Sequence, residues 1–84
     1  MRSIKETFKA LGIELESKYF IYTTKDRERT IVIPYHHIKS MELKESRVIV
    51  STGGLERITL ELPSEGLAKQ LFEELLLQLE KIYL

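Results

Sequence analysis

The apolar residues of this chain change their spacing at Pro63, and this change constrains the fold more than any other feature. Before it, Ile58, Leu60 and Leu62 alternate with polar residues, which predicts a strand with one buried and one solvated face. After it, apolar residues share one wide helical face: Leu67, Ala68, Leu71, Phe72, Leu75, Leu76, Leu79, Ile82 and Tyr83. A strand with one apolar face and an amphipathic helix must each bury that face, so we expect a sheet with a helix packed on it.

Stretches rich in β-branched and aromatic residues predict five or six antiparallel strands between residues 13 and 62. Pro34 ends one strand, and Gly53-Gly54 suit a hairpin turn. Ser17-Lys18 form either a turn between two strands or the middle of one long strand over 13–24. The predicted stretches are 13–24, 30–33, 39–44, 47–51 and 55–62.

Helices are expected at both ends of the chain. Ser3 and Glu6 are spaced as a capping box, and Gly12 is placed to end a short helix over 4–11. Ser64 is a suitable N-cap for a second helix over 64–83. The predicted fold class is therefore α+β. It is one domain over residues 1–84, a small antiparallel sheet or partly open roll of five to six strands, with the C-terminal helix packed on it.

The composition narrows the classes of function. The 84 residues include 13 basic and 13 acidic ones, and this zero net charge argues against nucleic-acid binding. The absence of cysteine excludes disulfides and thiolate catalysis, and we expect no cofactor. No apolar run follows Met1, and Leu75–Leu77 is far shorter than a membrane span, so we expect a soluble cytoplasmic protein.

The same composition suggests a heat-stable protein. Asp26 is the single Asp beside many Glu, and the chain has no Asn. Abundant Lys and Glu with few labile amides are typical of thermophile proteins. A melting temperature of about 45–65 °C, which is ordinary for a mesophile domain, would contradict this expectation.

The segment from Thr30 to Thr52 resembles the bacterial pleckstrin-homology-like domains. In those domains a strand enters an Ile-Pro-Tyr-x-x-Ile-x-Ser corner, here Ile33 to Ser40, and a second sheet follows. The strand-then-helix order at the C-terminus is also similar. The chain departs from the family in having one strand fewer than the seven-stranded roll and in its helical N-terminus. The resemblance implies a binding scaffold, and it specifies no ligand.

The basic loop residues Lys25, Arg27 and Arg29 are candidates for anion binding. In phosphoinositide-binding members of the wider pleckstrin-homology class, a basic loop between the first strands holds the phosphates. By that resemblance, this loop would bind a lipid headgroup or nucleic acid. Asp26 and Glu28 interleave with the cations and cancel much of their field, so the alternative is a solvated hairpin tip.

Chemistry at the remaining polar residues has little support in the sequence. His36 and His37 are the two histidines, and on an extended chain they would point to opposite sides, so we expect no metal site. Gly53-Gly54 lead into a strand and lack the lysine of a phosphate loop. Were the chain a small enzyme, Tyr22, Tyr35 and His36 would be the cluster to inspect.

Some apolar residues predict contacts with another chain. Leu77 and Leu84 lie opposite the buried face of the predicted helix, and Tyr19 and Tyr22 belong to a strand that is apolar on both faces. One face of that strand packs against the C-terminal helix, and the other must be buried by the N-terminal helix or by a partner chain. The second possibility predicts a homo-oligomer.

The leading hypothesis is a non-enzymatic interaction module that engages a protein partner or a second copy. Its surface would be a sheet edge, 31–33 or 48–50, or the groove beside the C-terminal helix. The alternatives are an anion-binding module that uses the basic loop, with at most peripheral lipid contact, and a small enzyme of unknown class.

Overall fold

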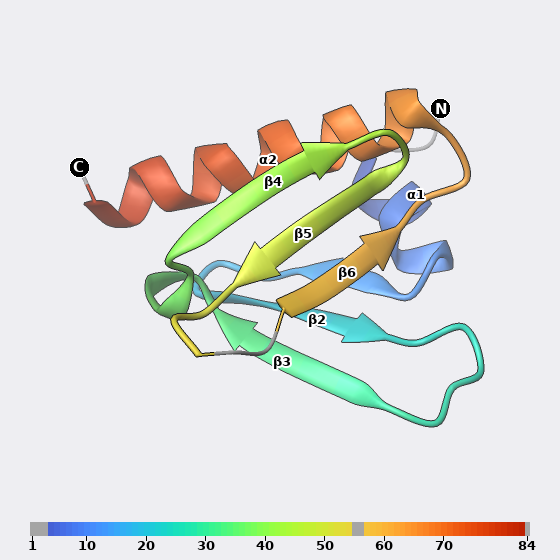
Figure 1. The fold of residues 1–84 in the computed structure, drawn as a ribbon, viewed down its shortest axis with the longest axis horizontal. Coiled ribbons are helices and arrows are strands. Elements are labelled where there is room, and N and C mark those ends of the chain that lie inside the picture. The colour runs from blue at the N-terminus through green and yellow to red at the C-terminus, as the bar shows by residue number, and fades with distance from the viewer. Residues whose placement is uncertain (1–3, 55–56, 84) are drawn as a thin grey trace.

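The computed structural model describes residues 4–54 and 57–83, and it has the predicted α+β fold. Two three-stranded antiparallel sheets follow each other along the chain, and a long helix closes the structure (Figure 1). Sheet A holds strands β1 (Ile13–Leu15), β2 (Tyr19–Thr23) and β3 (Thr30–Pro34). Sheet B holds β4 (Ser40–Lys44), β5 (Arg47–Ser51) and β6 (Arg57–Glu61). The helices are α1 (Ile4–Ala10), the 3-10 turn η1 (Tyr35–His37) and α2 (Glu65–Tyr83).

The segment 13–24 forms two strands rather than one. A turn at Ser17-Lys18 reverses the chain, and Leu15 pairs with Phe20 across it. The Glu16 N–H closes the turn by donating to the Tyr19 carbonyl at 2.9 Å. Three consecutive polar residues, Glu16, Ser17 and Lys18, interrupt the apolar alternation here, and this favours a turn.

The strand order corrects one of the two predicted edges. In sheet B, β5 is the central strand and pairs with both β4 and β6, so Val48–Val50 is not an edge. Its Val48 and Val50 side chains are fully buried, and a strand this apolar suits the centre of a sheet. Within the described residues, β3 and β4 each pair on one side alone, and β3 contains the predicted edge Ile31–Ile33.

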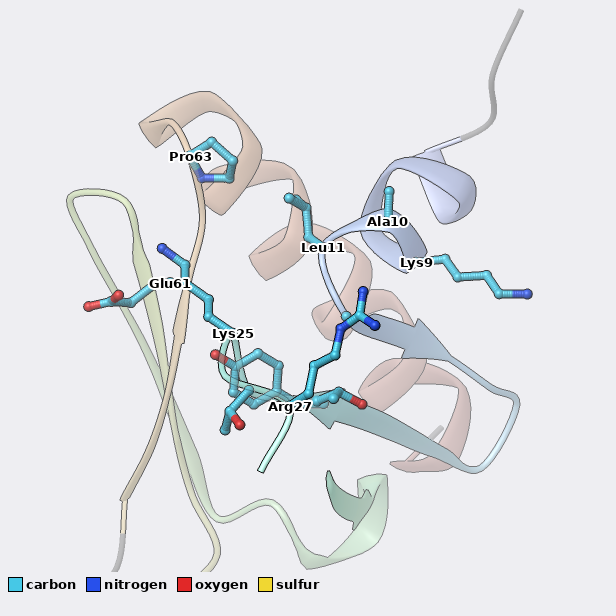
Figure 2. A pocket seen from close by; sticks show the side chains of 11 residues that line it. Lys9, Ala10, Leu11, Lys25, Arg27, Glu61 and Pro63 are labelled. Carbon is cyan, nitrogen blue, oxygen red and sulfur yellow. The ribbon is translucent and has the colours of Figure 1, made fainter. Parts of the chain in front are cut away.

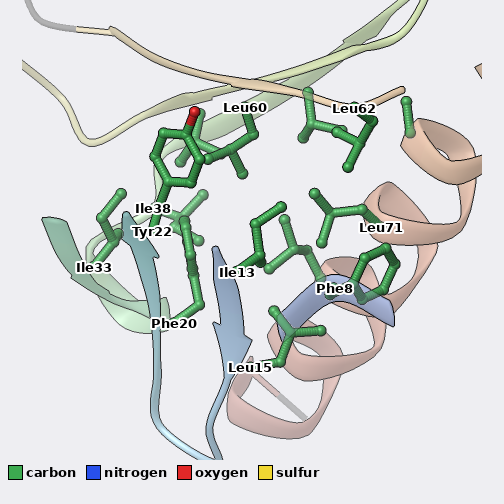
Figure 3. Packing of buried hydrophobic residues seen from close by; sticks show 14 of the residues in the cluster. Phe8, Ile13, Leu15, Phe20, Tyr22, Ile33, Ile38, Leu60, Leu62 and Leu71 are labelled. Atoms are coloured by element: carbon green, nitrogen blue, oxygen red, sulfur yellow. The ribbon is translucent and has the colours of Figure 1, made fainter. Parts of the chain in front are cut away.

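The core lies between the two sheets and the inner face of α2 (Figure 3). Tyr35 is its largest fully buried side chain, stacks on Phe20, and donates its hydroxyl to the Glu16 carbonyl at 2.7 Å. The other buried members are Phe8, Ile13, Leu15, Tyr22, Ile33, Ile38, Val48, Val50, Leu60, Leu62, Ala68, Leu71 and Leu75. The resulting cluster draws on every described strand except β4, whose Met41 packs against it.

Both predicted helices are present. Ser64 caps α2, because its Oγ accepts the Leu67 N–H at 3.2 Å. The helix packs on β5, β4 and η1. The N-terminal helix packs on β1 and buries Phe8 in the core. The predicted capping residue Ser3 lies outside the described residues. None of the described helices is long and apolar enough to cross a membrane.

Candidate functional site

An apolar groove runs between β4 and the C-terminal half of α2. It measures about 400 Å³, and its strand-side wall includes Ile38 and Met41. The helix-side wall is a single stripe at spacings of three and four residues: Phe72, Leu76, Leu79 and Tyr83. This stripe lies beside the fully buried Leu71 and Leu75, so the apolar face of α2 is wider than the core that it covers. The uncovered flank forms the groove.

The groove is bounded at one end by a contact between α2 and η1. The Tyr83 hydroxyl donates to the His36 carbonyl at 3.2 Å, although the Tyr83 side chain is 62% exposed. This bond ties the last turn of the helix to the corner between the two sheets. The opposite end continues along β4 toward Leu43, which is 38% exposed.

Strand β4 adds an open backbone edge to this groove. Among the described strands it pairs with β5 alone, from Ser40↔Ser51 to Lys44↔Arg47. The connection to β5 is tight, and Glu45 adopts a left-handed conformation in it, with φ of 55°. An edge strand offers N–H and C=O groups to a further strand.

The basic loop does not present its three cations together. Lys25 and Arg27 line a hollow of about 390 Å³ with Lys9 of α1 and Glu61 of β6, and the charged ends of Lys9 and Glu61 point away from it (Figure 2). Arg29 instead lines a neighbouring depression, which also includes Arg57, Ile58 and Thr59 of β6.

Sequence reasoning missed Lys9, because the contact that brings it near the loop is not local. The Thr23 N–H donates to the Gly12 carbonyl at 2.8 Å and so holds the end of α1 beside the end of β2. The Lys9 Nζ lies 3.9 Å from the Glu14 Oε1, in an ion pair that is exposed to solvent. No pattern in the sequence marks this lysine.

Asp26 stabilises the loop rather than only cancelling its charge. Its carboxylate accepts hydrogen bonds from the Thr24 hydroxyl and from the Glu28 N–H. These two bonds favour the ionised form and lower the pKa of Asp26. Arg27 follows in a left-handed conformation, with φ of 60°. The loop is therefore a hydrogen-bonded turn that directs Lys25 and Arg27 toward the hollow.

The residues suggested for catalysis do not form a cluster. Tyr35 is fully buried, and burial with the nearby Glu16 raises its pKa to about 12. Tyr35 directly follows Pro34, which pairs with Tyr19 at one end of β2. Tyr22 lies near the other end of β2, where it pairs with Ile31. Burial, followed by the charges of Glu61 and Asp26, raises the pKa of Tyr22.

The two histidines lie at a corner, and the expectation that their side chains point to opposite sides of an extended chain was wrong. His36 and His37 belong to a 3-10 turn rather than an extended strand, and their rings meet edge to face at 4.3 Å. Successive residues of such a turn do not alternate between two faces. Within the described part of the chain, no three His, Asp or Glu side chains gather as a metal ion would require.

The residues predicted for self-association differ in exposure. Leu77 is 49% exposed and Tyr19 39%, whereas Tyr22 faces the core and is 8% exposed. Leu84 lies outside the described residues. Val32 on β3 is 54% exposed, so α1 does not cover the outer face of sheet A at this position. This face and the α2 surface that carries Leu77 are separate candidates for contact with another chain.

No family model, curated protein or solved structure matches this chain.

The groove between β4 and α2 is the surface on which two independent features coincide. One is an unpaired strand edge, and the other is a continuous apolar flank of the helix. The hollow beside α1 is lined by Lys25 and Arg27, both exposed to solvent.

Proposed function

We propose that this chain is a non-enzymatic interaction module that binds an extended segment of a partner protein between β4 and α2. The segment adds a strand to the free edge of sheet B, and its side chains on one face enter the groove. This mode of binding is β-augmentation, in which backbone hydrogen bonds contribute affinity and side-chain pockets contribute specificity.

The coincidence of the edge and the groove carries the proposal. An edge alone is a general feature of open sheets, and an exposed leucine alone needs no explanation. Here Leu76 and Tyr83 remain 39% and 62% exposed directly beside the edge strand. Full burial of an exposed leucine-sized side chain contributes about 1.5–3 kcal/mol. These side chains are already partly covered, so each would contribute a part of that amount, and backbone hydrogen bonds along the edge must add to it.

The proposal extends to the scaffold. We propose that the chain is a variant of the pleckstrin-homology-like scaffold with six strands and an added N-terminal helix. Two successive antiparallel sheets and a C-terminal helix support this relation.

A peptide selection tests the proposed function. A library of random short peptides is selected on the whole chain, and each selected peptide is titrated against Leu76→Glu and Val32→Glu. Leu76 lines the groove, whereas Val32 is more exposed, lies on sheet A and serves as the control. We expect Leu76→Glu to weaken binding by at least tenfold, with Val32→Glu unchanged and both variants folded by circular dichroism. Failure to select any peptide, or equal binding by the two variants, would overturn the proposal.

The hollow beside α1 supports a second candidate function, the binding of a phosphate-bearing anion. Lys25 and Arg27 line it from the loop. The charges of the other two ionisable lining residues are paired elsewhere, Lys9 with Glu14 and Glu61 with Arg47. The lining thus has an excess of positive charge, which a phosphate group on a lipid or a nucleic acid would complement.

This candidate has its own test. Inorganic pyrophosphate is titrated into the protein at two salt concentrations and followed by amide chemical shifts. We expect Arg27→Ala to weaken binding and Arg29→Ala, whose side chain lines the other depression, to leave it nearly unchanged. Binding should also weaken steeply with salt. Equal effects of the two substitutions would reject the hollow as the site.

A further inference from the structure

We infer that the segment bound by β4 runs antiparallel to it and carries an acidic, an apolar, a basic and a second apolar residue, in that order from its N-terminus. This inference rests on the proposed function, because it concerns the same edge and the same groove. It follows from the side chains that β4 presents to an added strand.

The first position follows from an incomplete row of charges across sheet B. Lys44 pairs with Arg47 on β5, and Arg47 pairs with Glu61 on β6. Arg47 Nε and Glu61 Oε1 form an ion pair at 3.8 Å. From β6 to the edge strand β4, the row therefore reads Glu61, Arg47, Lys44. Like charges on directly opposite residues are unfavourable, and an acidic residue beyond Lys44 would offset them. The row therefore favours an acid on the added strand.

The third position follows from Glu42. This residue is exposed and pairs with Ile49, which in turn pairs with Thr59, so its row contains no other charge. Neither Glu42 nor Lys44 has an ion pair within the described residues. A basic residue opposite Glu42 would supply one.

The two apolar positions lie on the other face of the strand. Met41 and Leu43 alternate with the charged pair and lie opposite the buried Val50 and Val48, so they face the side covered by α2. A residue added opposite Met41 would lie beside the groove wall that Phe72 forms. Apolar side chains are therefore favoured at both positions.

The direction of the segment follows from the sheet. All pairs in sheet B are antiparallel, and antiparallel pairing is slightly more stable per residue than parallel pairing. From Lys44 back to Met41, the complementary residues then read acid, apolar, base, apolar.

Two synthetic peptides test this inference. One contains Glu-Val-Lys-Leu between flanking threonines, and the other contains Lys-Val-Glu-Leu in the same frame. Their affinities are measured by fluorescence anisotropy at low and physiological salt. We expect the first to bind about tenfold more tightly, since each cross-strand charge pair changes affinity by about two- to fivefold.

The double variant E42K/K44E is the decisive control. It exchanges the two charges without changing the net charge, and both positions are exposed, so folding should be unaffected. We expect the preference between the two peptides to invert. If Leu76→Glu abolishes binding but the two peptides bind equally, or the double variant does not invert the preference, the inferred order is overturned. The proposed function would then still stand. Binding of neither peptide, together with a self-paired dimer by light scattering, would show that a second copy occupies the edge and would overturn the inference.

Discussion

Gly12 ends α1 at a position that only a residue without a side chain fills easily. Its φ is +85°, and a Cβ atom would lie 2.6 Å from the carbonyl oxygen of Thr23. We expect Gly12→Ala to lower the free energy of unfolding by about 1–3 kcal/mol. Gly66 in α2 is the matched control, because a Cβ there would meet only the Ser64 Oγ at 3.9 Å. Gly66→Ala should raise stability by about 0.4–1 kcal/mol. Urea unfolding of both variants measures the difference, and equal effects would contradict the close approach to Thr23.

Tyr35 links stability to alkaline pH. Its pKa is raised from 10 to about 12 by burial and by Glu16, so the folded chain keeps a proton that the unfolded chain loses above pH 10. The contribution of the Tyr35 hydroxyl to the free energy of unfolding is fully present below pH 10 and is lost as the pH rises toward 12. We expect Tyr35→Phe to lower stability at neutral pH by about 1 kcal/mol, because the hydrogen bond to the Glu16 carbonyl is lost.

The measurement is denaturant unfolding of both proteins across pH 9–12. Stability of the wild type should fall more steeply with pH than that of Tyr35→Phe. Parallel pH profiles would show that the Tyr35 hydroxyl is not the group whose titration weakens the fold.

At the scale of elements, the start of α2 depends on one side chain. The Ser64 Oγ accepts the Leu67 N–H and satisfies a donor that the helix itself leaves unpaired. We expect Ser64→Ala to cost about 1 kcal/mol and Ser64→Asp to retain most of the stability. Thermal unfolding of the three proteins tests this. A loss in Ser64→Asp as large as in Ser64→Ala would argue against capping.

Local patterns predicted which elements form, because periodicity and capping act within a few residues. They did not predict correctly which strands lie at the edges. Val48–Val50 was one of two expected edges, but it lies in the centre of sheet B because it pairs with both β4 and β6. Pro34 marked the corner that holds His36 and His37, but it did not indicate that the corner is a 3-10 turn.

The candidate groove was predictable only in part. The wide apolar face of the C-terminal helix is visible in the sequence, and a groove beside that helix was one of the expected surfaces. The sequence did not indicate that Phe72 and Leu76 stay partly uncovered, since that depends on the distance between α2 and β4. Lys9 was missed for the same kind of reason, because a hydrogen bond between Gly12 and Thr23 places it.

For the molecule as a whole, association with a second copy stays a prediction. Leu77 is half exposed on α2 and takes no part in the core. We expect Leu77→Glu to remain folded and to weaken any dimer that uses this face. Size exclusion with light scattering at several concentrations measures the effect. A dimer of unchanged strength would reject Leu77 as a contact, and the exposed face of sheet A around Val32 would then be the surface to examine.

The strand order also has a kinetic consequence. Every pair of neighbouring strands, from β1 with β2 to β5 with β6, is consecutive in the chain, and none of the described pairings spans the two sheets. Sheet A is complete once Pro34 has been synthesised, before any residue of sheet B exists. Local pairings of this kind close short loops and speed folding. We therefore expect each sheet to form as a local unit, without waiting for strand pairing in the other sheet.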